Sequence, residues 1–149
     1  GDADIMVIDL PPGTGDVQLS LIQKINISGS VIVTTPQDIA LIDVVRGLKM
    51  FEKTKVPILG IVENMSYFLA PDTGREYNLY GESKTKEIAE KYDYEILANL
   101  PHDPFLMEQS DKGHPLTDLV PDHKVSKIFN ELAESLIKRL KLEKLSSTS

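Results

Sequence analysis

The feature that most constrains the fold is a regular alternation of short apolar runs with longer amphipathic stretches. A β-branched run at 31–35 and an apolar run at 58–62 are bounded by turn residues, a pattern typical of buried strands. Between them, residues 38–53 place apolar side chains at helical spacing. A strand, a helix and a second strand at this spacing form a right-handed βαβ unit. We therefore expect an α/β fold with a mainly parallel sheet flanked by helices.

The same patterning predicts the other elements of the chain. The stretch 66–80 sets Pro, Asp, Thr and Gly between aromatic residues, which predicts an irregular hairpin. Residues 102–111 are expected to form a loop with a short helical turn, and a polar tail over about 143–149 is expected to fray. Further strands are expected at 5–8 and 94–100, and further helices at 16–27, at 82–92 and from about 121 onward.

Composition bounds the class of protein. The chain has 149 residues, of which 41% are hydrophobic and 26% charged, as expected for one globular domain over 1–149. A formal charge of −7 argues against nucleic acid or an anionic membrane as a partner. No apolar run approaches the roughly 20 residues of a membrane span, so we expect a cytoplasmic protein. The absence of cysteine excludes disulfides and thiolate ligands.

The run at 5–8 ends on a single carboxylate, Asp9, and a Pro/Gly turn over 11–15 follows it. Ligands of open α/β sheets bind beyond the carboxyl ends of the strands. A carboxylate there suits Mg²⁺, and glycine amides such as that of Gly13 can approach a phosphate closely. The alternative is a plain corner between a strand and a capped helix, in which Asp9 is merely solvated.

Four segments, taken together and in order, resemble the Mrp (ApbC-like) family up to about Pro115. They are 8–16 (IDLPPGTGD), 33–37 (VTTPQ), 60–66 (GIVENMS) and 100–104 (LPHDP). Members of this family are deviant-Walker P-loop ATPases of the MinD-like group that carry and transfer iron–sulfur clusters. The resemblance implies a MinD-like P-loop NTPase fold, here without the P-loop strand.

The resemblance also implies residue roles. Asp9 matches the aspartate that holds Mg²⁺ through water, and Gly13 matches the amide donor to the terminal phosphate, so these are the candidate catalytic residues. Asn64 matches the asparagine that recognises the adenine edge, although an asparagine here would also suit a plain turn. Pro101, by itself, is a strand terminator. By resemblance, the other positions near the nucleotide are Gln37, Pro101 and Asp103.

Two departures from the family pattern limit these implications. The chain contains no glycine loop followed by Lys and Ser/Thr, so it resembles only the carboxyl-terminal part of the family, and most phosphate affinity should be missing. Where the family often has a Cys-Pro-x-Cys pair, this chain has Ala70 and Thr73. Neither side chain replaces a soft thiolate, and we expect no iron–sulfur ligands at this position.

The inherited function is Mg·ATP binding and hydrolysis by in-line attack of water, coupled to iron–sulfur cluster delivery to apo-protein acceptors. The chain alone is expected to be inactive, either as part of a longer ATPase or as one member of a split gene. It would act in a homodimer or in a heterodimer with a family member.

Other interpretations stay open. The main alternative is a degenerate, non-catalytic binding or scaffold module that pairs with a complete homologue; another is a MinD-like regulator. His102, His114 and His123 lack the spacing of zinc ligands. The aromatics of 66–80 are suited either to a partner surface or to a local cluster. Because the strand before Asp9 pairs with the P-loop strand in the family, the chain should expose a sheet edge.

Overall fold

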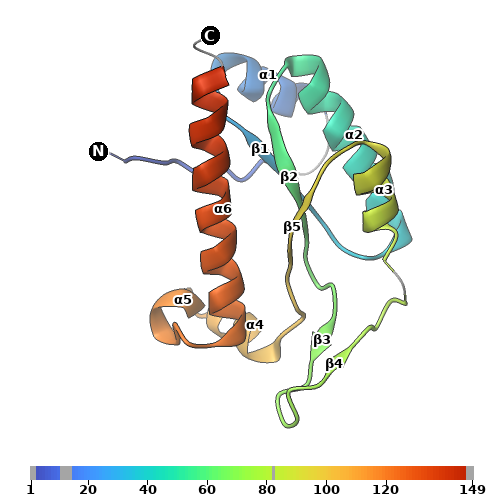
Figure 1. The fold of residues 1–149 in the computed structure, drawn as a ribbon, viewed down its shortest axis with the longest axis vertical. Helices are drawn as coiled ribbons and strands as arrows, with labels where there is room; N and C mark the ends of the chain where they lie inside the picture. Colours follow the sequence, from blue (N-terminus) through green and yellow to red (C-terminus); the bar gives the residue numbers. More distant parts are fainter. Residues whose placement is uncertain (1–2, 11–14, 82, 147–149) are drawn as a thin grey trace.

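The computed structural model describes residues 3–10, 15–81 and 83–146, with side chains described as far as residue 141. Its centre is a three-stranded sheet in the order β1-β2-β5, in which both strand pairs are parallel (Figure 1). This arrangement confirms the expected parallel α/β architecture. The strands of this sheet are β1 (Ser30–Thr34), β2 (Ile58–Glu63) and β5 (Ile96–Asn99).

Helices cover the sheet from both sides. Helix α2 packs on β1 and β2, whereas the long helix α6 lies across the sheet from it and contacts β2 and β5 (Figure 1). The helices are α1 (Asp16–Lys24), α2 (Asp38–Thr54), α3 (Thr85–Lys91), α4 (Pro104–Asp111), α5 (Leu116–Leu119) and α6 (Lys124–Ser146).

The main core lies between the sheet and the layer of α1, α2 and α3. Leu48 of α2 and Ile61 of the central strand are fully buried there. The opposite face of β1 is less covered: Val33 is 65% exposed, whereas its partner in β2, Val62, is buried. In the described residues, β1 is an edge strand with one apolar face open.

Gly60 of β2 has no room for a side chain next to β5 and the residue that precedes it. Its φ is 151°, and a Cβ added there would lie 2.6 Å from the Leu97 side chain and 2.8 Å from the carbonyl oxygen of Glu95. The φ value and the lack of space both require glycine. The register between β2 and β5 shifts immediately afterwards, between Ile61 and Val62.

The excursion between β2 and α3 contains the expected hairpin. Strands β3 (Phe68–Leu69) and β4 (Glu76–Tyr77) pair antiparallel. They extend beyond the carboxyl end of the main sheet, at the bottom of the view in Figure 1. The hairpin is held to the segment after β5, because the His102 amide donates to the Tyr67 carbonyl oxygen at 2.7 Å.

The prediction of a buried strand at 5–8 is wrong. This segment has no assigned strand, and Met6 and Val7 are 77% and 90% exposed. A parallel strand requires hydrogen-bonded neighbours in the sheet, and within the described residues no strand pairs with this segment. The apolar run is therefore extended but uncovered.

Several element boundaries also differ from the predictions. Helix α1 ends at Lys24, before the predicted end at 27, and 102–111 contains an eight-residue helix, α4, rather than a single turn. Helix α5 was not predicted. The backbone of α6 remains helical to Ser146, further than the predicted tail allows; residues 147–149 of that tail lie outside the described residues.

Candidate functional site

The predicted site is centred on Asn64, which directly follows the central strand at the carboxyl edge of the sheet. Its backbone amide donates to the Thr34 carbonyl oxygen of β1 at 2.7 Å, so the residue continues the ladder past the end of the strand. Met65 then adopts a left-handed conformation with φ 56°, and its amide donates to the Asn64 Oδ1 at 2.9 Å. These contacts fix the turn and leave the Asn64 NH₂ group without a partner among the described residues.

Glu63, the last residue of β2, is a site residue that the sequence reasoning missed. Its side chain is at the carboxyl edge and the residue is only 2% exposed. Ser66 Oγ donates to Oε1 at 2.6 Å, and Ser83 Oγ donates to Oε2. A carboxylate at the end of an otherwise apolar strand was the signal that could have drawn attention to it.

The segment that follows β5 lies beside this turn. The Ser66 amide donates to the Leu100 carbonyl oxygen at 2.9 Å, which brings the end of β5 next to the residues after Asn64. Pro101 is fully buried. The structure thus brings Asn64 and the 100–103 segment together, as the predicted nucleotide edge requires.

Asp103 is in the predicted segment, but its side chain has a structural role. It is 4% exposed, and its Oδ1 accepts hydrogen bonds from the amides of Phe105 and Leu106 at 2.8 and 3.3 Å. It is therefore the N-cap of α4. In this conformation the carboxylate shapes the loop rather than being presented to a ligand, and a direct contact with ribose stays a prediction.

His123 completes the environment of Asp103. Its Nε2 lies 3.7 Å from Asp103 Oδ2, and its Nδ1 accepts a hydrogen bond from the Val125 amide at 3.3 Å. The imidazole therefore caps α6 with one nitrogen and faces the cap of α4 with the other. This pair links the amino ends of two helices.

Three predicted site residues remain, namely Gln37, Asp9 and Gly13. Gln37 is exposed at the N-cap position of α2, after the end of β1, and its side chain makes no capping hydrogen bond. Asp9 is exposed in the extended segment, and no contact in the described residues joins it to Asn64. Gly13 lies outside the described residues, as do the other residues of 11–14.

Ala70 and Thr73, which the resemblance matches to the family's cysteines, lie at the turn of the β3–β4 hairpin. Ala70 is buried, and its carbonyl oxygen accepts from the Gly74 amide at 2.8 Å. Thr73 is exposed, and its Oγ1 accepts from the Arg75 amide at 3.4 Å. The side chains at these two positions are therefore a methyl and a hydroxyl group, which do not suit the ligation of an iron–sulfur cluster.

The hairpin is also joined to the start of α6 by a small polar cluster. Lys124 donates to the Glu76 carboxylate, and its Nζ lies 5.3 Å from the centre of the Tyr67 ring. The hydrogen bond with Glu76 raises the pKa of Lys124, and burial raises the pKa of Tyr67. The cluster connects the hairpin to the last helix.

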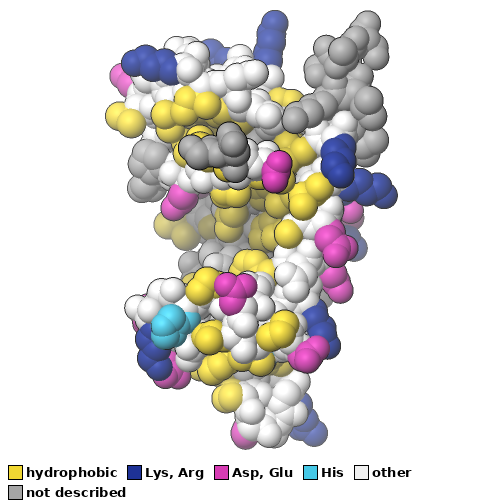
Figure 2. Space-filling view, turned by 90° about the vertical axis from the view of Figure 1, so that its left-hand side faces the viewer, with side chains coloured by type: hydrophobic (Ala, Val, Ile, Leu, Met, Phe, Trp, Pro, Cys, Tyr) yellow, Lys and Arg dark blue, Asp and Glu magenta, His cyan; other side chains and the backbone are white. Residues whose placement is uncertain are grey.

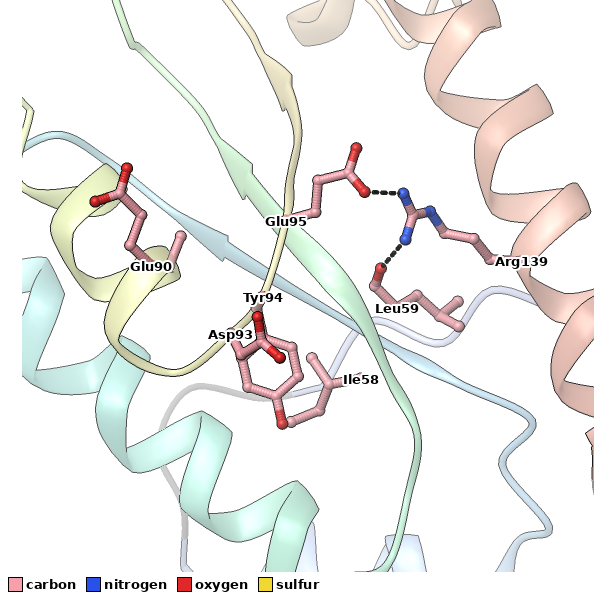
Figure 3. A pocket seen from close by; sticks show the side chains of 8 residues that line it. Ile58, Leu59, Glu90, Asp93, Tyr94, Glu95 and Arg139 are labelled. Atoms are coloured by element: carbon pink, nitrogen blue, oxygen red, sulfur yellow. Dashed lines mark hydrogen bonds and ion pairs between the residues drawn. The ribbon is translucent and has the colours of Figure 1, made fainter.

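A cavity of about 580 Å³ lies elsewhere, at the amino ends of β2 and β5. In Figure 3, the Arg139 guanidinium from α6 reaches over it to the Glu95 carboxylate and to the Leu59 carbonyl oxygen, the latter at 3.3 Å. Ligands of parallel sheets bind at the carboxyl edge, so this cavity is not the predicted nucleotide site. Arg139 instead anchors α6 to the sheet.

In the part of the chain that the structure describes, the carboxyl edge offers the unpaired Asn64 NH₂ group, a fixed turn and a capped loop. Such a set can recognise a planar, hydrogen-bonding group such as a purine edge. Within the described residues, no group of three or more acidic, histidine or cysteine side chains could hold a metal ion. The only carboxylate predicted to face Mg²⁺ is that of Asp9. Among the same residues, no helix is long and apolar enough to cross a membrane.

Comparison with known proteins shows the family of this chain. A family model described as ParA: NUBPL iron-transfer P-loop NTPase matches residues 1–137. An iron-sulfur cluster carrier protein from Aquifex aeolicus is 46% identical over 136 residues, which are 91% of this chain and 37% of that protein.

Solved structures are also similar to this chain. A nucleotide-binding protein from Archaeoglobus fulgidus in complex with ADP is 45% identical, with a TM-score of 0.61 over 70% of this chain and 43% of that one. The cell division ATPase MinD from Pyrococcus furiosus is 28% identical, with a TM-score of 0.55 over 74% of this chain and 43% of that one. The expected MinD-like fold is confirmed, and the chain spans less than half the length of each of these proteins.

Proposed function

Because this chain belongs to the ParA family of NUBPL iron-transfer P-loop NTPases, we propose that it supplies the adenine-facing part of a Mg·ATP site in an iron–sulfur cluster carrier. Asn64 is the residue that recognises the base, and the 100–103 segment lies against it. Asp9 would hold Mg²⁺ through water, which would shield charge on the terminal phosphate, and the Gly13 amide would donate to that phosphate.

The observation that carries this proposal is the geometry of Asn64. Its Oδ1 accepts from the Met65 amide at 2.9 Å, which fixes the direction of the side chain. The NH₂ group remains available among the described residues, and the second lone pair of Oδ1 can still accept. A fixed donor beside an acceptor is what an adenine edge requires.

The remaining parts of the function would come from outside these 149 residues. The sequence contains no glycine loop with a lysine, so we propose that the phosphate-binding loop is provided by another segment or another chain, in a cytoplasmic dimer that delivers clusters to apo-protein acceptors. With Ala70 and Thr73 at the hairpin turn, this chain would not itself ligate the cluster. This favours, as a second candidate, a non-catalytic module that pairs with a complete homologue.

Titration of the chain with Mg·ATP, followed by NMR, tests the proposal. We expect binding with a dissociation constant in the millimolar range, about −4 kcal/mol, because the base is recognised but most phosphate donors are missing. The shifted signals should include the Asn64 side-chain amide and the amides of 100–103. GTP should shift them less, because its base presents a different edge.

The matched variants are Asn64→Ala and, as control, Asn130→Ala on the exposed side of α6. The first should abolish the preference for ATP over GTP, and the second should leave the titration unchanged. Absence of any shift at millimolar ATP would contradict base recognition and favour the non-catalytic module. Micromolar affinity would contradict the claim that most phosphate affinity is missing.

A further inference from the structure

We propose that Glu63 is a positioning residue that clamps both ends of the 66–83 excursion and thereby fixes Asn64 for the base. This inference rests on the proposed function for the role of Asn64, but the clamp itself stands on contacts in the structure. The carboxylate belongs to the central strand, where its residue pairs with Thr34 of β1 and Asn99 of β5. It is therefore attached to the strand that is paired on both sides.

The first half of the clamp is local to the turn. Ser66 Oγ donates to Glu63 Oε1 at 2.6 Å, while the Ser66 amide donates to the Leu100 carbonyl oxygen at 2.9 Å. Asn64 and Met65 lie between the two partners of the hydroxyl–carboxylate bond. Because Met65 has a positive φ of 56°, which non-glycine residues rarely adopt, the turn requires surrounding contacts of this kind to hold it.

The second half of the clamp comes from the far end of the excursion. Ser83 Oγ donates to the other carboxylate oxygen, Oε2, and also accepts from the Thr85 amide at 3.1 Å. Thr85 is the first residue of α3 and is fully buried. One carboxylate thus connects the turn at Asn64, the excursion and the start of α3.

Because Glu63 is buried, its hydrogen bonds to Ser66 and Ser83 strongly influence the conformation of the turn at Asn64. Glu63 is 2% exposed, and in the described residues the ion pairs do not include it. Among the described residues, the two serine hydroxyls are its side-chain partners, and a buried polar group that loses a hydrogen-bond partner costs free energy. If Ser83 withdraws, the carboxylate loses one of the two donors that it has among the described residues, and the turn at Asn64 loses part of its support. A displacement of the excursion is therefore transmitted to the base-recognising residue.

Hydrogen exchange on the 149-residue chain tests the clamp without nucleotide. In Ser83→Ala, we expect the amides of Met65 and Ser66 to exchange about tenfold faster, since one hydrogen bond to a buried carboxyl group is lost. The Ile61 amide, which donates to Glu95 in the sheet, should keep its rate, which separates local loosening from global destabilisation. Ser83→Thr retains the hydroxyl and should restore slow exchange, and Ser110→Ala, at an exposed serine of α4, is the control.

The second readout is base selectivity. Ser83→Ala should lower the ratio of ATP to GTP affinity toward one, although Ser83 itself does not touch the predicted base site. Unchanged exchange at Met65 and Ser66 in Ser83→Ala would overturn the clamp, whether or not nucleotide binds. Faster exchange with unchanged selectivity in a chain that binds ATP would overturn the link to Asn64. If the wild-type chain binds no purine nucleotide, the proposed function fails, while the exchange result still decides the clamp.

Discussion

At the scale of single residues, the resemblance places Asp103 near the nucleotide, whereas in the structure its side chain caps a helix. It caps α4 through two amides and faces His123 while almost fully buried. We predict that Asp103→Ala lowers the free energy of unfolding by about 1–2 kcal/mol, the usual cost of losing an N-cap. Asp103→Asn should lose much less, because asparagine is also a good N-cap.

Urea unfolding followed by circular dichroism measures this difference. Asp72→Ala, at an exposed residue near the hairpin turn, is the matched control and should change stability by less than about 0.5 kcal/mol. Equal stability of Asp103→Ala and wild type would mean that the cap does not hold α4 in solution, and would free the carboxylate for the predicted contact with the nucleotide.

At the scale of elements, the contact between the β3–β4 hairpin and α6 should weaken in alkaline solution. The pKa of Lys124 is raised by its bond to Glu76, and the pKa of Tyr67 is raised by burial. A folded-state pKa above the unfolded value contributes stability that is complete at neutral pH. That contribution is lost as the pH rises above the ordinary values of about 10 for tyrosine and 10.4 for lysine.

The measurement is the free energy of unfolding as a function of pH for wild type, Glu76→Gln and Tyr67→Phe. We expect the wild type to lose stability above about pH 10. Both variants should lose less stability, because each lacks one of the groups that contribute to the raised pKa values of Lys124 and Tyr67. Since Lys124 and Glu76 are half exposed, the effect should also shrink in high salt. A wild-type pH profile that coincides with that of both variants would contradict a role for this cluster.

The elements also show what the sequence could and could not predict. The runs at 31–35 and 58–62 and the helix over 38–53 were predicted because their periodicity agrees with their burial in the structure. The run at 5–8 has equally strong strand character, but a strand depends on neighbours that lie elsewhere in sequence. Asp103 followed by Pro104 is a signal for a helix start, and this signal could have predicted α4.

The clamp could not be predicted in the same way. Ser66 and Ser83 lie at opposite ends of an irregular excursion, and nothing in the local sequence indicates that both meet the carboxylate of Glu63. Their meeting depends on the path of the hairpin and on the place where α3 begins. Motif resemblance identified Asn64 but not the residues that hold it, because supporting contacts follow from topology rather than from a short pattern.

At the scale of the whole molecule, the uncovered apolar surface predicts self-association. Figure 2 shows apolar side chains in a hollow on the side where the amino-terminal segment and α6 lie, and Met6, Val7 and Val33 are all more than half exposed. The edge of β1 adds unpaired backbone groups. Exposed edges and patches of this kind lead chains to pair or aggregate.

We therefore expect the sedimentation coefficient of the chain to rise with concentration, and Val33→Lys combined with Val7→Lys to suppress the rise. Ile39→Lys is the control, because Ile39 is 75% exposed but belongs to α2, which packs on the face of β1 opposite to Val33. A wild-type chain that stays monomeric at all concentrations, or a control that acts as strongly as the double variant, would contradict pairing through this surface.

The close approach at Gly60 has a consequence for the evolution of the whole chain. The backbone oxygen that excludes a side chain there belongs to Glu95, whose carboxylate binds Arg139 of α6. A methyl group at position 60 would therefore push against the same residue that docks the last helix. Mutational tolerance along β2 should be uneven as a result: aliphatic exchanges at Ile58 can be absorbed by repacking, whereas position 60 admits only glycine unless the sheet and α6 move together.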